Sequence, residues 1–273
     1  MVREGLVLSD ALELHPDFYD WRELREALGK HADVIRYNGE MTLRRIRKEE
    51  TRTIERVRTG RNQWFELGAS DALPDSLSAG QRRAATELLK SRDFVSVLIG
   101  DAGTGKTTVL TAIEKSHVAR GGQSFIALAP TTRARDALKD SGFEVADTVP
   151  RFLVSKTMQA TSVGRVILVD EAGLLSTEQL DALTQKASDL RARLLLVGDT
   201  KQHYSVQRGD GLRNVVKNAG LPIVRLTEVL RQRNMWDRNF SRLLAEGDAA
   251  EAILFAERRG LLREVTRDDA MFK

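Results

Sequence analysis

Short apolar runs alternate with longer amphipathic stretches through the central part of the chain. Glycine, proline or aspartate bounds most of the five runs, which are Phe94–Ile99, Ser124–Ala129, Val166–Val169, Leu194–Val197 and Ile223–Leu226. Continuously apolar runs of this length are typical of strands that are buried on both faces of a parallel sheet. The spacing between the runs leaves room for crossover helices. The pattern therefore predicts an α/β fold in which helices flank a parallel sheet.

A helical pattern precedes the predicted sheet. Four apolar residues fall within one narrow stripe, at about 0°, 300°, 20° and 320° on a helical wheel of ~100° per residue: Leu43, Ile46, Ile54 and Val57. We expect a helix over Thr42–Arg61, with Gly60 as its C-terminal stop. Further helices are expected near Ser9 or Asp10 and over Trp21–Lys30, so the N-terminal region is predicted to be mainly helical.

These patterns divide the chain into four parts. We expect a helical N-terminal region at 1–65, a linker at 66–76, the sheet-containing domain at 77–235, and a helical segment at 236–273. No run of ~18 apolar residues interrupts them, so no transmembrane helix is expected. The first residues contain no apolar signal core, and we therefore expect a cytoplasmic protein.

Composition excludes several kinds of site. The chain has no cysteine, which excludes disulfides, cysteine-bound metal centres and a cysteine nucleophile. Its four histidines do not occur at metal-binding spacings. The net charge is only +4, but residues 41–62 carry eight basic and three acidic side chains, or +5. This segment is either the solvated face of a packed helix or a contact for a polyanion, and the sequence leaves both explanations open.

One segment carries a specific chemical signal. Gly100–Thr107, with the sequence GDAGTGKT, fits the P-loop pattern, follows a predicted strand, and opens a predicted helix over Thr107–Arg120. Its glycines let backbone N–H groups surround phosphate oxygens. Lys106 adds a positive charge, and the Thr107 hydroxyl can bind Mg²⁺. The segment predicts a nucleotide site at the N-terminus of that helix.

A pair of carboxylates follows the strand Val166–Val169. Downstream of a P-loop, Asp170 is expected to hold Mg²⁺ through water, and Glu171 to polarise the attacking water. Without the P-loop, an apolar strand that ends in two acidic residues would more often be an ordinary surface termination.

Other polar segments have a plain structural explanation beside a functional one. Asp199 and Gln202 follow a strand and fit a turn as well as a ligand site, because open parallel sheets bind ligands at this edge. Arg231 lies either near a γ-phosphate or at a solvated helix start. Pro130–Arg135 suits a phosphate backbone or a threonine-capped helix, and Gln81 suits a capping box with Ser78 or a contact with adenine.

The order of these segments resembles a known family. The residues that carry the resemblance are 77–84, 100–108, 129–133, 147–148, 169–172, 197–206 and 228–236. Together they resemble the first motor domain of superfamily 1 DNA helicases of the RecD-like, 5′-to-3′ type, and most of all the helicase portion of conjugative relaxase–helicases. The resemblance implies a RecA-like P-loop NTPase fold and ATP hydrolysis coupled to single-stranded DNA.

The resemblance also implies roles for single residues. Gln81 would read adenine, and the phosphates of ATP would be held by Gly100, Gly103, Thr104, Gly105, Lys106, Thr107 and Thr108. Mg²⁺ would be bound by Thr107 and Asp170, and Glu171 would activate water. Gln202 would sense the γ-phosphate, and Arg231 would be the arginine finger. The DNA backbone would be touched by Thr132, Arg133 and Thr148.

The family works with two RecA-like domains, and these 273 residues contain one of them. We therefore expect a fragment of a conjugative relaxase–helicase, completed by a second motor domain or by self-association. The alternative is a nucleotide-gated or constitutive DNA-binding adaptor that works through the basic helix Thr42–Arg61 and the Pro130–Arg135 loop. A small-molecule kinase fits less well, because it needs neither Gly198–Gln202 nor Glu228–Arg233.

Overall fold

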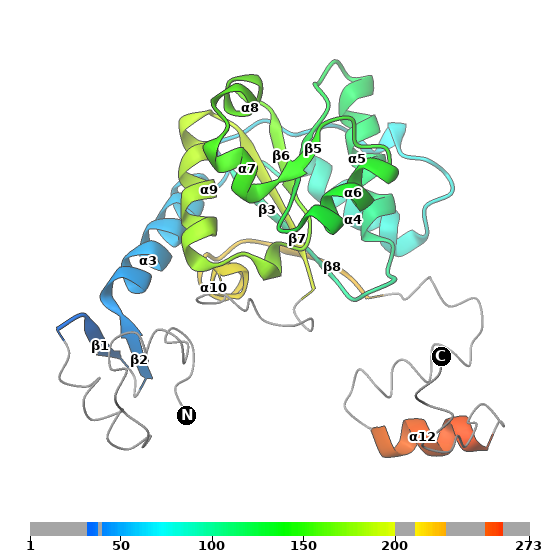
Figure 1. The fold of residues 1–273 in the computed structure, drawn as a ribbon. Helices are drawn as coiled ribbons and strands as arrows, with labels where there is room; N and C mark the ends of the chain where they lie inside the picture. Colours follow the sequence, from blue (N-terminus) through cyan, green and yellow to red (C-terminus); the bar gives the residue numbers. More distant parts are fainter. Residues whose placement is uncertain (1–31, 38–39, 200–210, 228–248, 259–273) are drawn as a thin grey trace. The chain divides into compact units, whose positions relative to one another are not determined.

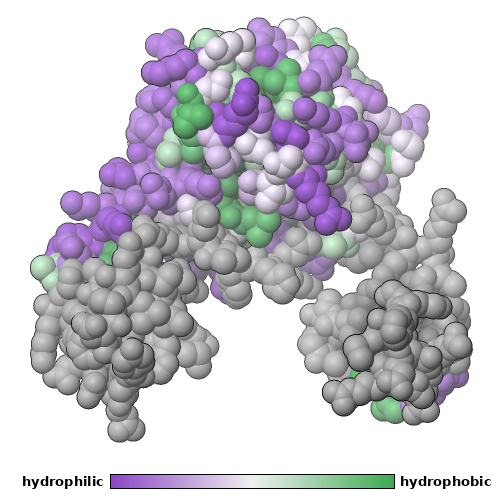
Figure 2. All heavy atoms as spheres, viewed as in Figure 1, coloured by the Kyte–Doolittle hydropathy of each residue, from purple (hydrophilic) through white to green (hydrophobic). Residues whose placement is uncertain are grey.

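The computed structural model describes residues 32–37, 40–199, 211–227 and 249–258 (Figure 1). The chain forms two compact units, Met1–Thr227 and Glu228–Lys273. In the second unit the structure describes one helix, α12 (Ala249–Glu257), in which Ile253 and Leu254 are exposed. The visible face of the first unit is mostly hydrophilic, with small separate apolar areas (Figure 2).

A parallel sheet forms the centre of this unit. Its strands are β3 (Val95–Gly100), β4 (Ile126–Ala129), β5 (Ala146–Thr148), β6 (Val166–Val169), β7 (Arg193–Gly198) and β8 (Ile223–Leu226). They lie in the order β5-β4-β6-β7-β3-β8, and every neighbouring pair is parallel. The five predicted strands are confirmed. The short strand β5 was not predicted, because it has three residues and contains the polar Asp147.

Helices cover both faces of the sheet (Figure 1). One buried cluster joins the sheet to α4 (Ala79–Lys90), α5 (Lys106–Ala119) and α6 (Thr132–Asp140). A second cluster joins the other face to α3 (Arg44–Thr59), α7 (Val149–Val154), α9 (Thr177–Asp189) and α10 (Gly211–Asn218). The described residues of this unit also form short helices, which are α8 (Lys156–Thr161) and the 3-10 turns η1 (Ser70–Ala72) and η2 (Ala172–Leu174).

Strand side chains alternate between the two clusters. In β3, Val97 and Ile99 belong to the cluster around α9, whereas Leu98 belongs to the cluster around α5. This alternation follows from the two-residue period of a strand, and it explains why the strands are apolar without interruption. The predicted α/β class, with a parallel sheet between layers of helices, is confirmed.

The described part of the N-terminal region differs in one respect from the expectation. A small antiparallel hairpin of β1 (Val34–Tyr37) and β2 (Glu40–Leu43) precedes α3 where mainly helical structure was expected. The sequence signal for it was present, since Asn38-Gly39 between two β-prone runs is a strong hairpin indication. The predicted basic helix is confirmed, beginning at Arg44, and its apolar stripe is buried at Ile46 and Val57. The predicted helices near Ser9 and over Trp21–Lys30 lie outside the described residues.

Candidate nucleotide-binding site

The P-loop connects the carboxyl end of β3 to the first residue of α5. Gly103 and Gly105 have φ angles of 80° and 81°, in the left-handed region that glycine adopts without strain. A Cβ atom on Gly100 would lie 2.8 Å from Thr104 Oγ1 and 3.2 Å from the carbonyl oxygen of Leu226, so a side chain does not fit there. The glycine positions thus fix the loop shape that leads into the helix.

Side chains of the loop bond to its own backbone. Lys106 Nζ donates to the carbonyl oxygens of Gly100 (2.6 Å) and Asp101 (3.2 Å). The buried Thr104 donates from Oγ1 to the Asp101 carbonyl at 2.8 Å. Thr107 is half-buried and Thr108 is exposed, both in the first turn of α5. The predicted loop–helix context is confirmed, and the N-terminus of α5 adds a favourable field for an anion.

The two carboxylates lie at the same edge of the sheet as the P-loop. Asp170 and Glu171 follow β6, and only β7 separates β6 from β3. Burial raises the pKa of Asp170. Two interactions lower this pKa: the hydrogen bond that the Glu171 N–H donates to Asp170 Oδ1 (2.9 Å), and the positive charge of Lys106. Burial and the charge of Asp170 raise the pKa of Glu171, whereas Lys106 and Arg133 lower it. The sheet order therefore brings Lys106 within electrostatic reach of both acids.

Glu171 has an unusual backbone conformation. Its φ of 52° and ψ of 35° lie in the left-handed region, which costs a non-glycine residue roughly 1–2 kcal/mol. The Glu171 carbonyl accepts a hydrogen bond from the Leu174 N–H at 2.9 Å, and the turn η2 begins directly after Glu171. Strained residues that the surrounding structure holds in place are common at functional sites. No pattern in the sequence predicted this conformation.

Gln81 lies beside the loop. Its Oε1 accepts from the Ser78 N–H at 3.1 Å, and its N–H donates to Ser78 Oγ at 3.2 Å, which confirms the predicted capping box of α4. Its Nε2 donates to the carbonyl of Thr104 at 3.5 Å. The amide therefore links the start of α4 to the P-loop, while a contact with adenine stays a prediction.

The three predicted DNA contacts lie at the carboxyl ends of β4 and β5. Ala129 of β4 pairs with Thr148 of β5, so the residues after β4 and Thr148 share one edge of the sheet. Thr132 and Arg133 are exposed in the first turn of α6. The helix cap is Thr131, whose Oγ1 accepts from the Ala134 N–H at 3.2 Å, and Thr148 caps α7 in the same way. The threonine-cap explanation is thus confirmed, and it leaves the side chains of Thr132 and Arg133 exposed.

Some predicted residues cannot be placed. Gln202 and Arg231 lie outside the described residues, although β7, which leads toward Gln202, runs between the strands of the P-loop and of Asp170. Within the described parts, no cluster of three or more histidine, aspartate or glutamate side chains could bind a metal by itself. None of the described helices is long and apolar enough to cross a membrane.

Comparison with known proteins places the chain in a family. The AAA_30 family, described as an AAA domain, matches residues 76–267. A probable conjugal transfer protein TraA of Sinorhizobium fredii is 25% identical over 175 residues, which cover 63% of this chain and 16% of that protein. The multifunctional conjugation protein TraI of Escherichia coli is 25% identical over 169 residues, which cover 59% of this chain and 10% of TraI. The chain thus spans only a small part of these relatives.

Among solved structures, the Pif1 helicase of Candida albicans is similar at a TM-score of 0.49 and 20% identity, covering 62% of this chain and 44% of that one. A Bacteroides Pif1 bound to single-stranded DNA has a TM-score of 0.48 and 17% identity, with 63% and 46% coverage. The predicted similarity to conjugation proteins is confirmed, while the superfamily 1 helicase assignment and its RecD-like type stay predictions. The family match covers most of the chain, and the chain therefore belongs to the AAA domain family.

Proposed function

We propose that this chain is the ATP-hydrolysing motor domain of a DNA helicase or translocase that moves on single-stranded DNA. The observation that carries the proposal is the gathering of Lys106, Asp170 and Glu171 at one edge of the sheet. A point charge for phosphate, a metal-binding acid and a candidate base are the groups that phosphoryl transfer to water requires. The relationship to conjugation proteins supports DNA as the partner.

The geometry supports a specific division of labour. Lys106 would leave the carbonyls of Gly100 and Asp101 and donate to the β- and γ-phosphates. The oxygens of Thr107 and Asp170 are ligands that Mg²⁺ prefers, and the metal would neutralise charge on the phosphates. Glu171 would take a proton from the attacking water as the γ-phosphorus–oxygen bond to ADP breaks. Gln202 and Arg231 keep their proposed roles as γ-phosphate sensor and arginine finger.

The DNA contacts would lie one strand away from this chemistry. Thr132 and Arg133 begin α6 shortly after β4, Thr148 is the last residue of β5, and β4 pairs directly with β6. Short hydroxyls and an arginine suit the phosphate backbone and need no particular base. The charge of Arg133 also acts on Glu171, which provides a short electrostatic path between DNA and the base.

The proposal requires a second RecA-like domain besides the one described here. Motors of this kind place ATP between two RecA-like domains, so we propose that a second motor domain or another copy of this chain completes the site, in the context of a conjugative relaxase–helicase. The DNA-binding adaptor has less support, because the basic helix it would use is partly occupied by packing against α9.

The direct test is ATP hydrolysis with and without single-stranded DNA, for the wild type and Lys106→Ala, at several protein concentrations. We expect hydrolysis that DNA stimulates and that the variant loses, because the variant removes the charge that binds the β- and γ-phosphates. A steep dependence on protein concentration would identify self-association. Intact DNA binding without hydrolysis in either protein would contradict completion of the site by self-association, and would mean that the chain alone is a motor fragment or the adaptor.

Gln81→Glu separates the two roles of Gln81. A glutamate oxygen still accepts the Ser78 N–H, so we expect α4 to stay capped and the thermal unfolding midpoint to change little. The variant loses the Nε2 donor, and we therefore expect ATP to bind about fivefold more weakly, since one lost hydrogen bond to a base costs on the order of 1 kcal/mol. The affinities for ATP and GTP measure the effect. Unchanged ATP affinity would show that Gln81 only caps the helix.

A further inference from the structure

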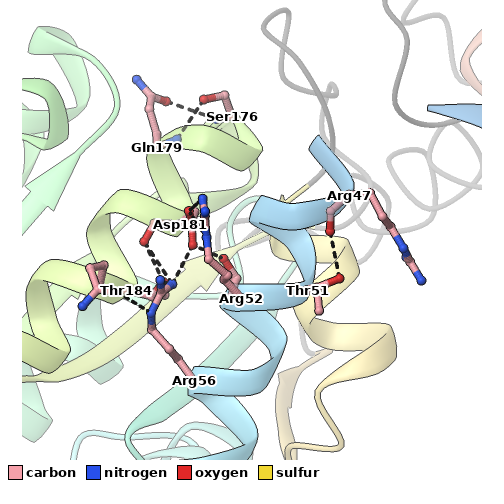
Figure 3. A network of polar contacts seen from close by, with 10 residues as sticks. Arg47, Thr51, Arg52, Arg56, Ser176, Gln179, Asp181 and Thr184 are labelled. Atoms are coloured by element: carbon pink, nitrogen blue, oxygen red, sulfur yellow. Dashed lines mark hydrogen bonds and ion pairs between the residues drawn. The ribbon is translucent and has the colours of Figure 1, made fainter. Parts of the chain in front are cut away.

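The basic helix α3 is bound to α9 by ion pairs with one buried carboxylate, that of Asp181 (Figure 3). Arg52 donates to Asp181 Oδ2 from Nη2 (2.5 Å) and from Nε (3.2 Å). Arg56 donates from Nη1 to Asp181 Oδ1 at 2.6 Å, and the Thr53 hydroxyl lies 3.4 Å from the same oxygen. Asp181 is only 7% exposed, so two charged partners compensate for its burial. We call Arg52, Arg56 and Asp181 the Asp181 latch.

The contact continues along both helices. Arg56 also donates to Thr184 Oγ1 at 3.2 Å and to Gln185 Oε1 at 2.9 Å. On α3 the arginines are four residues apart, and on α9 their partners follow at three and four residues, so each set occupies one helix face. These multiple bonds fix α9 along its length and against rotation.

The short segment 172–176 connects Glu171 to the start of α9, and its backbone forms hydrogen bonds within the segment and to Glu171. The Leu174 N–H donates to the Glu171 carbonyl, and the Leu175 N–H donates to the Ala172 carbonyl at 3.2 Å. Leu175 is fully buried, and Ser176 then caps α9. Because the hydrogen bonds of Leu174 and Leu175 and the burial of Leu175 hold this segment, a displacement of α9 would be transmitted to the left-handed backbone at Glu171.

α3 also forms a hydrogen bond with α10, the second helix that contacts the segment after Glu171. Arg58 Nη2 donates to the carbonyl of Asn218, near the C-terminus of α10, at 2.7 Å. At the N-terminal end of α10, Leu212 Cδ2 fills the space above Gly198 and Gly173, where added Cβ atoms would lie 2.6 Å and 3.9 Å from it. α3 therefore braces the two helices that lie against the turn after Glu171.

We infer that Arg52, Arg56 and Asp181 are positioning residues for ATP hydrolysis, which hold α9 and thereby the carboxylate of Glu171 in its working place. The inference rests on the proposed function of Glu171. The family match begins at residue 76, so α3 lies outside it. The Asp181 latch therefore makes α3, which the family match does not include, part of the proposed motor domain.

The test is Asp181→Asn in the full chain, which preserves size but removes the charge. We expect the kcat of DNA-stimulated ATP hydrolysis to fall about tenfold, because small displacements of a catalytic group are costly, with KM for ATP and nucleotide affinity unchanged. Asp181→Glu, which keeps the charge, should restore much of kcat. The matched control is Asp71→Asn, which breaks the exposed pair with Arg120 at 2.7 Å, and kcat should then equal that of the wild type.

Amide hydrogen exchange provides a readout that needs no activity. In Asp181→Asn we expect faster exchange in residues 170–176 and unchanged exchange in the P-loop, residues 100–105. If the wild-type chain alone hydrolyses no ATP, completion of its site by self-association fails, while exchange still decides the inference. Faster exchange confined to α3, with residues 170–176 and kcat unchanged, would overturn it. If Asp181→Asn does not fold, the milder Arg52→Gln should show the same changes at smaller size.

Discussion

Glu171→Gln is expected to lower the rate of ATP hydrolysis by a factor on the order of 10³ while ATP still binds with near wild-type affinity. Glutamine has nearly the same shape and backbone preferences as glutamate, so the left-handed turn at this position should persist. The amide cannot accept a proton from the attacking water, whereas Lys106, Thr107 and Asp170 remain to hold the phosphates and Mg²⁺. Single-turnover hydrolysis and equilibrium binding of a fluorescent ATP analogue measure the two effects.

Glu178→Gln is the matched control for this prediction. Glu178 is exposed in the first turn of α9, seven positions after Glu171, and it undergoes the same chemical change without approaching the P-loop. Its hydrolysis rate should equal that of the wild type. If Glu171→Gln also hydrolysed ATP at the wild-type rate, another residue would have to activate the water, and Asp170 would be the first candidate.

The parts of the site that sequence predicted are those encoded by local pattern. A buried strand needs an uninterrupted apolar run, and a P-loop needs its glycines and lysine at fixed spacing. The strands β3 and β6 and the loop before α5 were therefore predicted, and Lys106 and the acids after β6 could be proposed as site residues. The capping box of α4 is likewise a pattern of four residues. β5 was not predicted, because its three residues, Ala146–Thr148, include a charged one and form a strand only when β4 is available as a partner.

The partners of buried charged side chains could not be predicted from the sequence. The basic segment was identified, but its partner Asp181 lies 129 positions from Arg52, and no local pattern connects them. The same holds for Arg193, the first residue of an otherwise apolar strand, which a sequence pattern treats as a boundary. Long-range ion pairs and hydrogen bonds depend on how α3 and the sheet pack, which is a property of the tertiary fold.

Arg193 is a buried cation that joins three segments at the amino end of β7. Its guanidinium donates to the carbonyls of Asp93 (3.1 Å), Phe65 (2.8 Å) and Ser91 (3.0 Å). Burial lowers its pKa to about 10, with Asp93 acting in the opposite direction, so the side chain stays charged at neutral pH. Phe65 lies between α3 and α4, and the other two residues lie between α4 and β3. The arginine thus fastens the connection from α3 to the core.

Arg193→Met is expected to lower the free energy of unfolding by roughly 3–5 kcal/mol, which is a large part of the 5–15 kcal/mol typical of a domain. Methionine fills similar space but leaves three carbonyls without their donors and removes a cation whose charge interacts with the buried Asp93. Urea unfolding followed by circular dichroism measures the change. Arg120→Met removes an arginine whose pair with Asp71 is exposed, and should cost under about 1 kcal/mol. Equal losses in the two variants would show that the three carbonyl bonds of Arg193 add nothing beyond an ordinary surface pair. A loss confined to Arg193→Met would show that the link between α3 and the motor core is part of the stability of the fold.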